Sequence, residues 1–330
     1  MKKKRFNNEI GSVMVLVTVA LIVLVGFGAL AVDGGSLYLT KSKLQNTVDA
    51  AALAGAQDLP QDTSTAISTA ISYANNNKPS GTTIDTPEIM DGSRAIKVTA
   101  HKNVSLGLAK IFGSSLGEVS ATATARVDPF SKGSGVLPFG VTENVFRDED
   151  GNIETGDVEI KFGSHGDPEE YWEELANGHS WRGPLRLETK DGGTNGANRY
   201  YDNIVNGCGE ILWIGKVVPI EPGNMSGKTR MGVNDFLDEY DPPYGLIPIV
   251  EPIYLEEDDP QYGNAEIDQH NLRIAEFAIF EILGVAGNGK QSIVTGRFVT
   301  SVVAGIGEPI NEDGDDDGGE YSAYVARLVE

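Results

Sequence analysis

Two glycine-rich segments match part of the pattern by which backbone amides cradle nucleotide phosphates. In Gly284–Lys290 the glycine spacing fits, but Gln291 stands where a hydroxyl must hold magnesium, and a β-like run follows where a helix is needed. The segment Gly223–Thr229 ends in Lys-Thr, but Pro222 stands in place of the first glycine. We therefore expect a hairpin at the first segment, a turn at the second and no bound nucleotide.

The pentapeptide Gly113–Gly117 has the G-x-S-x-G form of a hydrolase nucleophile, with Ser115 at its centre. Such a serine needs a strand before it and a helix after it. The order of elements expected around Ser115 is the reverse, and the four histidines lack the H-E-x-x-H spacing of zinc proteases. The sequence therefore predicts that the protein is not an enzyme and has no catalytic residue.

An acidic loop at residues 311–320 is the strongest candidate metal site. Asp313, Asp315, Asp317 and Gly318 occupy positions one, three, five and six of an EF-hand loop, but Tyr324 stands at position twelve, which requires glutamate. Two interpretations stay open: a calcium site with the weak affinity of extracellular modules, about 10⁻⁴–10⁻³ M, or a solvated hairpin loop. No other cofactor is expected.

Two shorter acidic segments are weaker metal candidates. Asp62–Ala66 resembles the D-x-S-x-S metal site of von Willebrand factor A domains, but Ala66 lacks the required hydroxyl. Asp148–Asn152 has the composition of a turn. We expect neither segment to bind metal strongly.

Composition limits the partners and the compartment. The chain of 330 residues carries 48 acidic and 26 basic side chains, and its formal charge of −22 argues against nucleic acid as a partner. Cys208 is the single cysteine, so neither an intramolecular disulfide nor a cysteine-based zinc site can form. Forty glycines and fifteen prolines favour many turns between short strands.

The segment Val13–Val32 predicts a transmembrane helix. It has no charged residue, and at about 1.5 Å per residue it spans the roughly 30 Å hydrocarbon core of a bilayer. The basic cluster Lys2–Arg5 precedes it and Asp33 follows, so residues 1–12 are expected in the cytoplasm and the acidic remainder outside the cell. The competing interpretation is a signal peptide cleaved after Ala29-Leu30-Ala31. Against it, the apolar run is longer than the apolar region of a typical signal peptide, and it continues directly into a helical pattern.

This helix is expected to continue outside the membrane to about Asp58, before Pro60 ends it. Leu37, Leu44, Val48 and Ala51 lie near one stripe of the continued helix. The stripe packs either against the protein's own sheet alone or also against neighbouring subunits.

Residues 10–58 together resemble the TadG-like N-terminal region of Flp (tight-adherence) pilus-assembly proteins. The resemblance rests on the apolar run, Ala31-Val32-Asp33, Leu37-Tyr38 and Leu44–Ala56, which reads LQNTVDAAALAGA. It implies a membrane-anchored, pilin-like accessory protein at the cell surface, with pilin-like or other Tad-system proteins as partners and no catalytic activity. Leu16 stands where a prepilin-type site has glutamate after Gly11, which argues against a major pilin.

The small residues Gly26 and Gly28 would permit close helix packing in lipid. Together with the stripe of Leu37, Leu44, Val48 and Ala51, they form the predicted interaction helix. The alternative function is a stand-alone adhesion module at the cell surface that works without a pilus.

The fold class expected is α+β, with a small α/β head over residues 33–128 and a β-rich, acidic extracytoplasmic domain over residues 129–330. In the head we expect helices at Ser64–Tyr73 and Leu106–Phe112, and strands at Ala95–Val104 and Val119–Val127. A break at Asp128–Gly135 marks the boundary. Beyond it we expect a helix at Asn234–Glu239 and a β sandwich or irregular β domain. Its predicted strands are Val136–Val141, Val158–Phe162, Ile211–Val218, Leu246–Tyr254, Phe277–Leu283, Ile293–Val303 and Tyr321–Val329.

Overall fold

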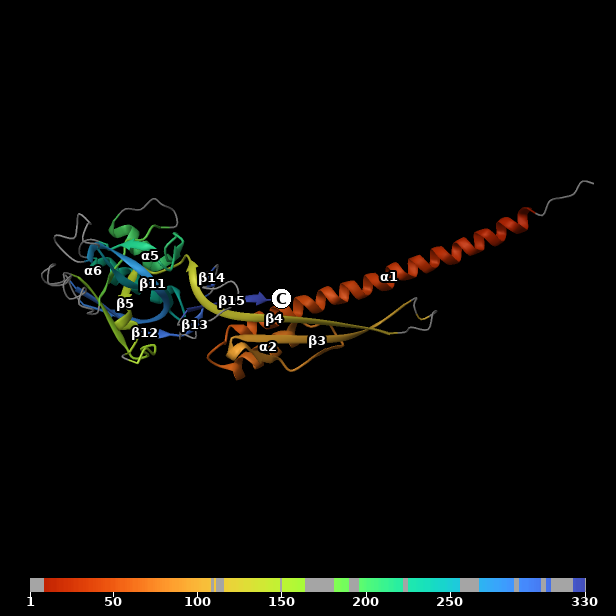
Figure 1. Ribbon diagram of the computed structural model, residues 1–330, viewed down its shortest axis with the longest axis horizontal. Helices are drawn as coiled ribbons and strands as arrows, with labels where there is room; N and C mark the ends of the chain where they lie inside the picture. The colour runs from red at the N-terminus through yellow and green to blue at the C-terminus, as the bar shows by residue number, and fades with distance from the viewer. Residues whose placement is uncertain are drawn as a thin grey trace, which may run out of the picture. The chain divides into compact units, whose positions relative to one another are not determined.

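A computed structural model describes the chain at residues 9–107, 110, 116–148, 150–163, 181–189, 196–221, 225–255, 267–287, 291–303, 307–309 and 323–329. The chain divides into two compact units, one of Met1–Arg126 with Arg327–Glu330 and one of Val127–Ala326. A long apolar helix is followed by a β-rich region that also carries helices (Figure 1), which confirms the predicted α+β class.

The first unit begins with α1 (Glu9–Ala56), a single helix of 48 residues. It ends two residues before the predicted Asp58, and a turn there is closed by hydrogen bonds from Asp58 N to Gly55 O and from Leu59 N to Ala56 O. Pro60 follows this turn, where a proline cannot interrupt helical hydrogen bonds.

The second helix, α2 (Thr63–Asn77), lies against the end of α1. Its buried stripe consists of Ala66, Ala70 and Ala74. A Cβ placed on Gly55 of α1 would lie 2.8 Å from Ala66 O and 2.9 Å from the Ala70 Cβ. The two helices therefore approach closely because both carry small residues at the contact.

A β ribbon packs on the helices of the first unit. It pairs β3 (Ala95–Ser105) with β4 (Leu116–Gly133) in antiparallel register from Ala95↔Arg126 to Ser105↔Leu116. The short strands β1 (Thr82–Ile84) and β2 (Glu88–Met90) pair with β3, and the 3-10 turn η1 (Asp91–Ser93) connects β2 to β3. One face of the ribbon is apolar and buried. Its residues are Ile96, Val98 and Ala100 on β3 and Ala121, Ala123 and Ala125 on β4.

β4 runs without a break through most of the predicted boundary at Asp128–Gly135, as far as Gly133, although the chain divides into its two units close by, between Arg126 and Val127. Pro129 lies between the β4 residues paired with β3, which end at Arg126, and those paired with β14 (Gly307–Pro309), which begin at Phe130. Neither of these two ladders includes Pro129, so neither needs the N–H that proline lacks. Most of the helix predicted at Leu106–Phe112 lies outside the described residues.

The second unit is built on a sheet in the order β6-β12-β11-β10-β5-β7, with β9 also pairing β11. All described pairs are antiparallel except the parallel pair of β10 and β5. The strands are β5 (Phe139–Thr142), β6 (Val158–Gly163), β7 (Arg182–Pro184), β9 (Val217–Pro219), β10 (Tyr244–Tyr254), β11 (Ile267–Ala286) and β12 (Gln291–Val299).

Both faces of this sheet are buried. Along β11, Ala278 and Phe280 belong to one hydrophobic cluster, whereas Phe277 and Ile279 belong to another, as the alternation of a strand requires. The first cluster is covered by α3 (Glu143–Phe146), α5 (Ala197–Asn206) and α6 (Ser226–Glu239). The second contains Trp181, Leu185, Leu187, Cys208 and Leu212. Burial on both faces explains why the central strands read as nearly continuous apolar runs.

Several predicted boundaries in the second unit are wrong. The single strand expected at Ile211–Val218 is two strands, β8 (Leu212–Trp213) and β9, separated at Gly215, which has φ of +90°. The strand expected at Ile293–Val303 ends with β12 and resumes as β13 (Ser301–Val302), which pairs with β15 (Ala323–Val329). The helix expected at Asn234–Glu239 begins eight residues earlier, at Ser226, and α5 was not predicted.

Candidate interaction surface

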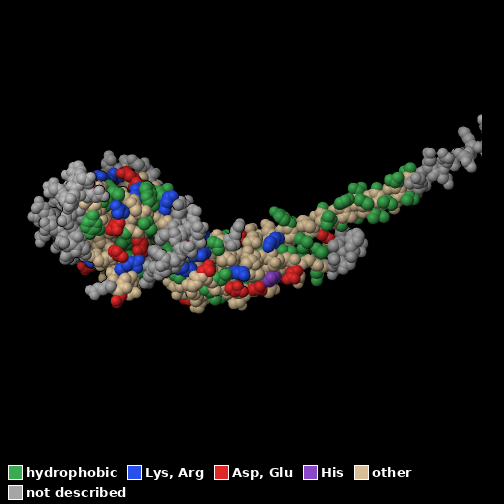
Figure 2. Space-filling model, in the orientation of Figure 1, with side chains coloured by type: hydrophobic (Ala, Val, Ile, Leu, Met, Phe, Trp, Pro, Cys, Tyr) green, Lys and Arg blue, Asp and Glu red, His purple; other side chains and the backbone are tan. Residues whose placement is uncertain are grey.

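The apolar part of α1 is the candidate functional surface. Among the described residues, α1 is the one helix long and apolar enough to cross a membrane. Its large side chains from Val13 to Val32 point into open space on every side, with Leu16 and Leu24 at 70% and 65% exposure. Figure 2 shows these hydrophobic side chains around the segment. A helix that is apolar all round and uncovered is suited to lipid.

Gly26 and Gly28 lie within this uncovered segment. A Cβ placed on either glycine would meet no atom within 4 Å. Their surface is therefore open, and the missing side chains would let another helix approach the backbone closely. The role predicted for these two glycines in helix packing stays a prediction.

Of the two interpretations of the stripe on α1, the structure favours packing within the same unit for three of its residues. Leu44, Val48 and Ala51 are 0% exposed, because the end of α1 packs against α2 and β3 of the same unit. A side chain that the protein's own core covers cannot also contact a partner. Leu37 is partly buried, and a Cβ placed on Gly117 of β4 would lie 2.9 Å from its Cδ2.

Polar residues of α1 also hold the ribbon, a role that the sequence analysis missed. Lys41 Nζ donates to Ser120 O at 2.5 Å, and Gln45 Nε2 donates to Thr122 O at 3.0 Å. Gln45 Nε2 also donates to the Asp49 carboxylate at 2.8 Å. These side chains satisfy β4 carbonyls and so tie the ribbon to α1. The spacing of four residues between Lys41, Gln45 and Asp49 was the available signal.

The weaker acidic segments have structural roles. Asp62 caps α2, since its carboxylate accepts from the backbone N–H groups of Ser64 and Thr65 at 3.0 and 2.9 Å and from both hydroxyls. These hydrogen bonds, led by the Ser64 hydroxyl, hold the pKa of Asp62 well below its usual range. Asp148 closes the predicted turn by accepting from Asn152 N at 2.8 Å, and hydrogen bonds from Asn152 lower the pKa of its carboxyl.

The calcium candidates Asp313, Asp315 and Asp317 lie outside the described residues. In the part of the chain that the structure describes, no group of three or more His, Cys, Asp or Glu side chains is placed to hold a metal ion. The calcium interpretation therefore stays a prediction.

The predictions for the two glycine-rich segments, Gly284–Lys290 and Gly223–Thr229, have different outcomes. Gly284–Lys290 joins β11 to β12, which pair in antiparallel register up to Ala286↔Ile293, so the predicted hairpin is confirmed. The turn expected at Gly223–Thr229 is wrong in its last residues, because α6 begins at Ser226. Thr229 does not offer its hydroxyl to magnesium there, since this buried group donates to Met225 O at 3.0 Å and lies 3.2 Å from Tyr200 Oη.

The serine of the G-x-S-x-G segment is followed by a strand, whereas the nucleophile of a hydrolase is followed by a helix. Ser115 lies outside the described residues, but β4 begins directly after it, at Leu116, where a hydrolase has a helix. Cys208 is buried, and this burial raises the pKa of its thiol to about 11. A thiol in such a site stays protonated and unreactive at neutral pH.

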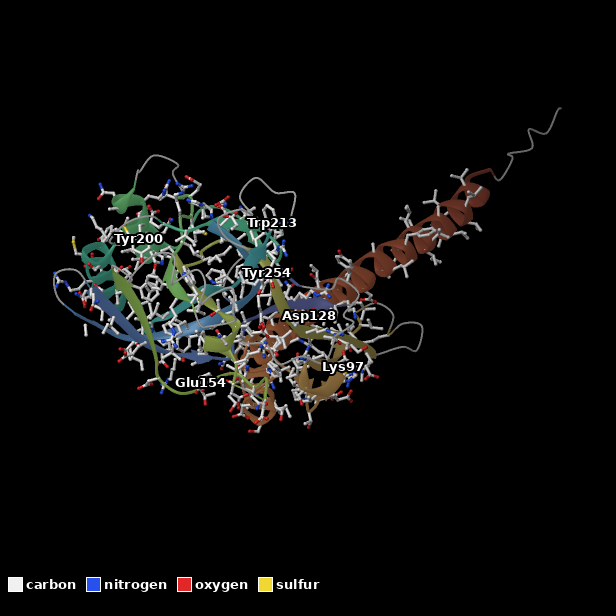
Figure 3. The ribbon with its side chains drawn as sticks, turned by 60° about the vertical axis from the view of Figure 1, so that its left-hand side comes forward. Lys97, Asp128, Glu154, Tyr200, Trp213 and Tyr254 are labelled. Carbon is white, nitrogen blue, oxygen red and sulfur yellow. The ribbon has the colours of Figure 1, made fainter. Side chains whose placement is uncertain are left out.

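Aromatic residues of the second unit mainly build its core. Trp181 and Tyr200 are 2% and 1% exposed. Figure 3 marks Tyr200, which comes from α5, and Trp213, which is exposed on β8 with Lys216 Nζ 4.5 Å above its ring.

Comparisons with known proteins identify the N-terminal segment. Residues 11–58 match the model of a family described as putative Flp pilus-assembly TadE/G-like, which confirms the resemblance seen in the sequence. No curated protein and no solved structure matches the chain. The matched residues coincide with α1 and the turn after it. The match supports involvement in Flp pilus assembly in general.

Proposed function

We propose that this chain is a membrane-anchored, non-enzymatic component of Flp pilus assembly, with a minor-pilin-like role at the cell surface in adherence. The observation that carries the proposal is the coincidence of the matched segment, residues 11–58, with a helix whose first half is apolar and uncovered. The second half of α1 is fixed to α2 and β3, so the free half is left to contact lipid and partner helices. The proposal assigns no cofactor, nucleotide or catalytic step to the chain.

The proposed orientation places the N-terminus in the cytoplasm and both units outside. It follows from the basic cluster Lys2–Arg5 before the apolar span and the net negative charge of the chain after it. Protease added to intact, wall-stripped cells is expected to digest a C-terminal tag and to spare an N-terminal tag. If the C-terminal tag is protected in intact cells and digested only after lysis, the chain has the opposite orientation to the one proposed.

The proposed contact is lateral packing of α1 with pilin-like helices near Gly28. Replacing Gly28 with leucine adds bulk to an open surface within the apolar span, so we expect it to reduce crosslinked partner recovered with the protein. The matched control is Gly34→Leu, which makes the same change at an equally open position beyond Asp33. Equal recovery of pilin-like partner from both variants would exclude packing at Gly28.

A further inference from the structure

The outer face of the β3–β4 ribbon is polar along most of its length. Its successive cross-strand pairs are Lys97↔Thr124, Thr99↔Thr122, His101↔Ser120 and Asn103↔Glu118. Figure 3 marks Lys97 on β3. Thr99 and Thr122 place their hydroxyl oxygens 3.2 Å apart, and His101 Nε2 lies 2.9 Å from the Asp85 carboxylate. This face is therefore suited to water.

The polarity changes at the end of the ribbon. The last pair is Ser105↔Leu116, and Leu116 is 63% exposed on a face where the β4 residues that follow it are glutamate, serine and threonine. The connecting sequence from residue 106 to residue 116 carries a single charge, at Lys110, whose side chain is exposed. An exposed leucine at the ribbon end and an exposed lysine in the same connection are suited to a membrane interface, where apolar groups enter the acyl boundary and the amine reaches the headgroups.

The same end of the ribbon lies beside the limit of the apolar span of α1. Gly107 N donates to the Asp33 carboxylate at 2.7 Å, and Asp33 is 7% exposed. Figure 1 shows β3 and β4 running alongside α1. Ala29 lies one turn, about 6 Å, further into the apolar span on the same face, and it is also only 7% exposed. The ribbon therefore reaches the level at which α1 passes from lipid to water.

We propose that the end of the β3–β4 ribbon rests in the headgroup and acyl boundary of the membrane, with Leu116 in lipid and Lys110 at the headgroups. The proposal rests on the membrane-spanning role of α1. It assigns Asp33 the role of fixing the ribbon at this depth, because a carboxylate at the lipid boundary needs a hydrogen-bond donor and Gly107 supplies one. The ribbon then gives the first unit a second membrane contact besides α1.

Lipid is favoured over a protein partner for Leu116 because of its position. Leu116 pairs with Ser105, two residues before the Gly107 that binds Asp33, and the surroundings of a spanning helix near that depth are lipid headgroups and acyl chains. Ser120 is the matched aqueous reference, since it is exposed on the same face of β4 about 13 Å further from the end. The outer face of β4 therefore changes from a polar residue at Ser120 to an apolar residue at Leu116 over the distance in which the surroundings are proposed to change from water to lipid.

The test uses the full chain in phosphatidylethanolamine and phosphatidylglycerol vesicles with a fluorophore on one introduced cysteine. The variants are Leu116→Cys, Ser120→Cys and, as an intramembrane reference, Val25→Cys. Cys208 is buried, and the chain without an added cysteine serves as the labelling blank. The vesicles contain lipids that carry a quencher either near the headgroup or along the acyl chain. Loss of fluorescence with one of these lipids shows that the labelled residue lies at that depth of the membrane.

We expect loss of fluorescence at residue 116 with the headgroup-proximal quencher, loss at residue 25 with the acyl quencher, and full fluorescence at residue 120. Quenching at residue 25 without quenching at residue 116 would show that α1 spans the membrane but that the ribbon end does not contact it, which would overturn this inference alone. Absence of quenching at residue 25 would show that α1 does not span the bilayer, which would contradict both the membrane contact of the ribbon and the proposed function. These outcomes separate the two proposals.

Discussion

Replacing Gly55 with leucine is expected to destabilise the first unit severely. A Cβ at this position would lie 2.8 Å from Ala66 O and 2.9 Å from both Ala70 Cβ and Ile96 Cδ1. Since Ala66 O is backbone, no side-chain rotation can make room, and α1 must move away from α2 and β3. We expect a loss of folding free energy at the upper end of the ~1–3 kcal/mol typical of overpacked cores.

Hydrogen exchange of the α2 backbone in lipid bicelles measures this effect. Gly55→Leu should expose the amides of Thr63–Asn77 to faster exchange, because local stability depends on the packing of α2 on α1. Gly34→Leu is the matched control on the same helix, since nothing lies within 4 Å of its Cβ position. Unchanged exchange of α2 in Gly55→Leu would show that the two helices do not pack as described.

The helices and ribbon of the first unit were largely predictable because their patterns are regular. α2 shows Ala66, Ala70 and Ala74 at helical spacing, and the apolar face of β3 alternates strictly over Ile96, Val98 and Ala100. The extension of β4 beyond Val127 was missed because Asp128 and Pro129 look like a break. Such local signals cannot show that a strand changes pairing partners and continues.

The elements missed in the second unit owe their structure to tertiary packing. α6 buries Thr229, Gly232 and Val233, a stripe of mostly small or polar residues that gives a weak hydrophobic pattern. Gly232 makes a close contact there, since a Cβ would lie 3.0 Å from Ile204 of α5. α5 is only ten residues long, but it buries Tyr200, Asn203 and Ile204 at helical spacing, so its periodic signal was present in the sequence and was overlooked. For α6 the weak pattern did not show where the helix begins.

The role of the predicted interaction helix in partner contact stays a prediction, but the structure shows which of its residues are covered. A stripe of apolar residues on a helix indicates that the face is covered, without showing whether the cover is the same chain or a partner. For Leu44, Val48 and Ala51 the cover is the same chain. The surface that stays open is the apolar span around Gly26 and Gly28, where composition alone indicated lipid.

Loss of the gene is expected to have the largest functional effect, a strong reduction of pilus-like fibres on native cells. The reason is that the family match covers residues 11–58, and a helix with a covered half and a free half can join an assembly only through the free half. Plasmid-borne wild type and Gly34→Leu should restore the fibres. Gly28→Leu should restore them poorly at equal protein level, since it adds bulk to the proposed contact.

Fibre counts by electron microscopy, made on deletion and complemented strains under conditions that express the protein, test the pilus assignment most directly. We predict few fibres and weak attachment in the deletion strain, recovery with wild type and Gly34→Leu, and little recovery with Gly28→Leu. Fibres and attachment at wild-type levels in the deletion strain would contradict a role in pilus assembly.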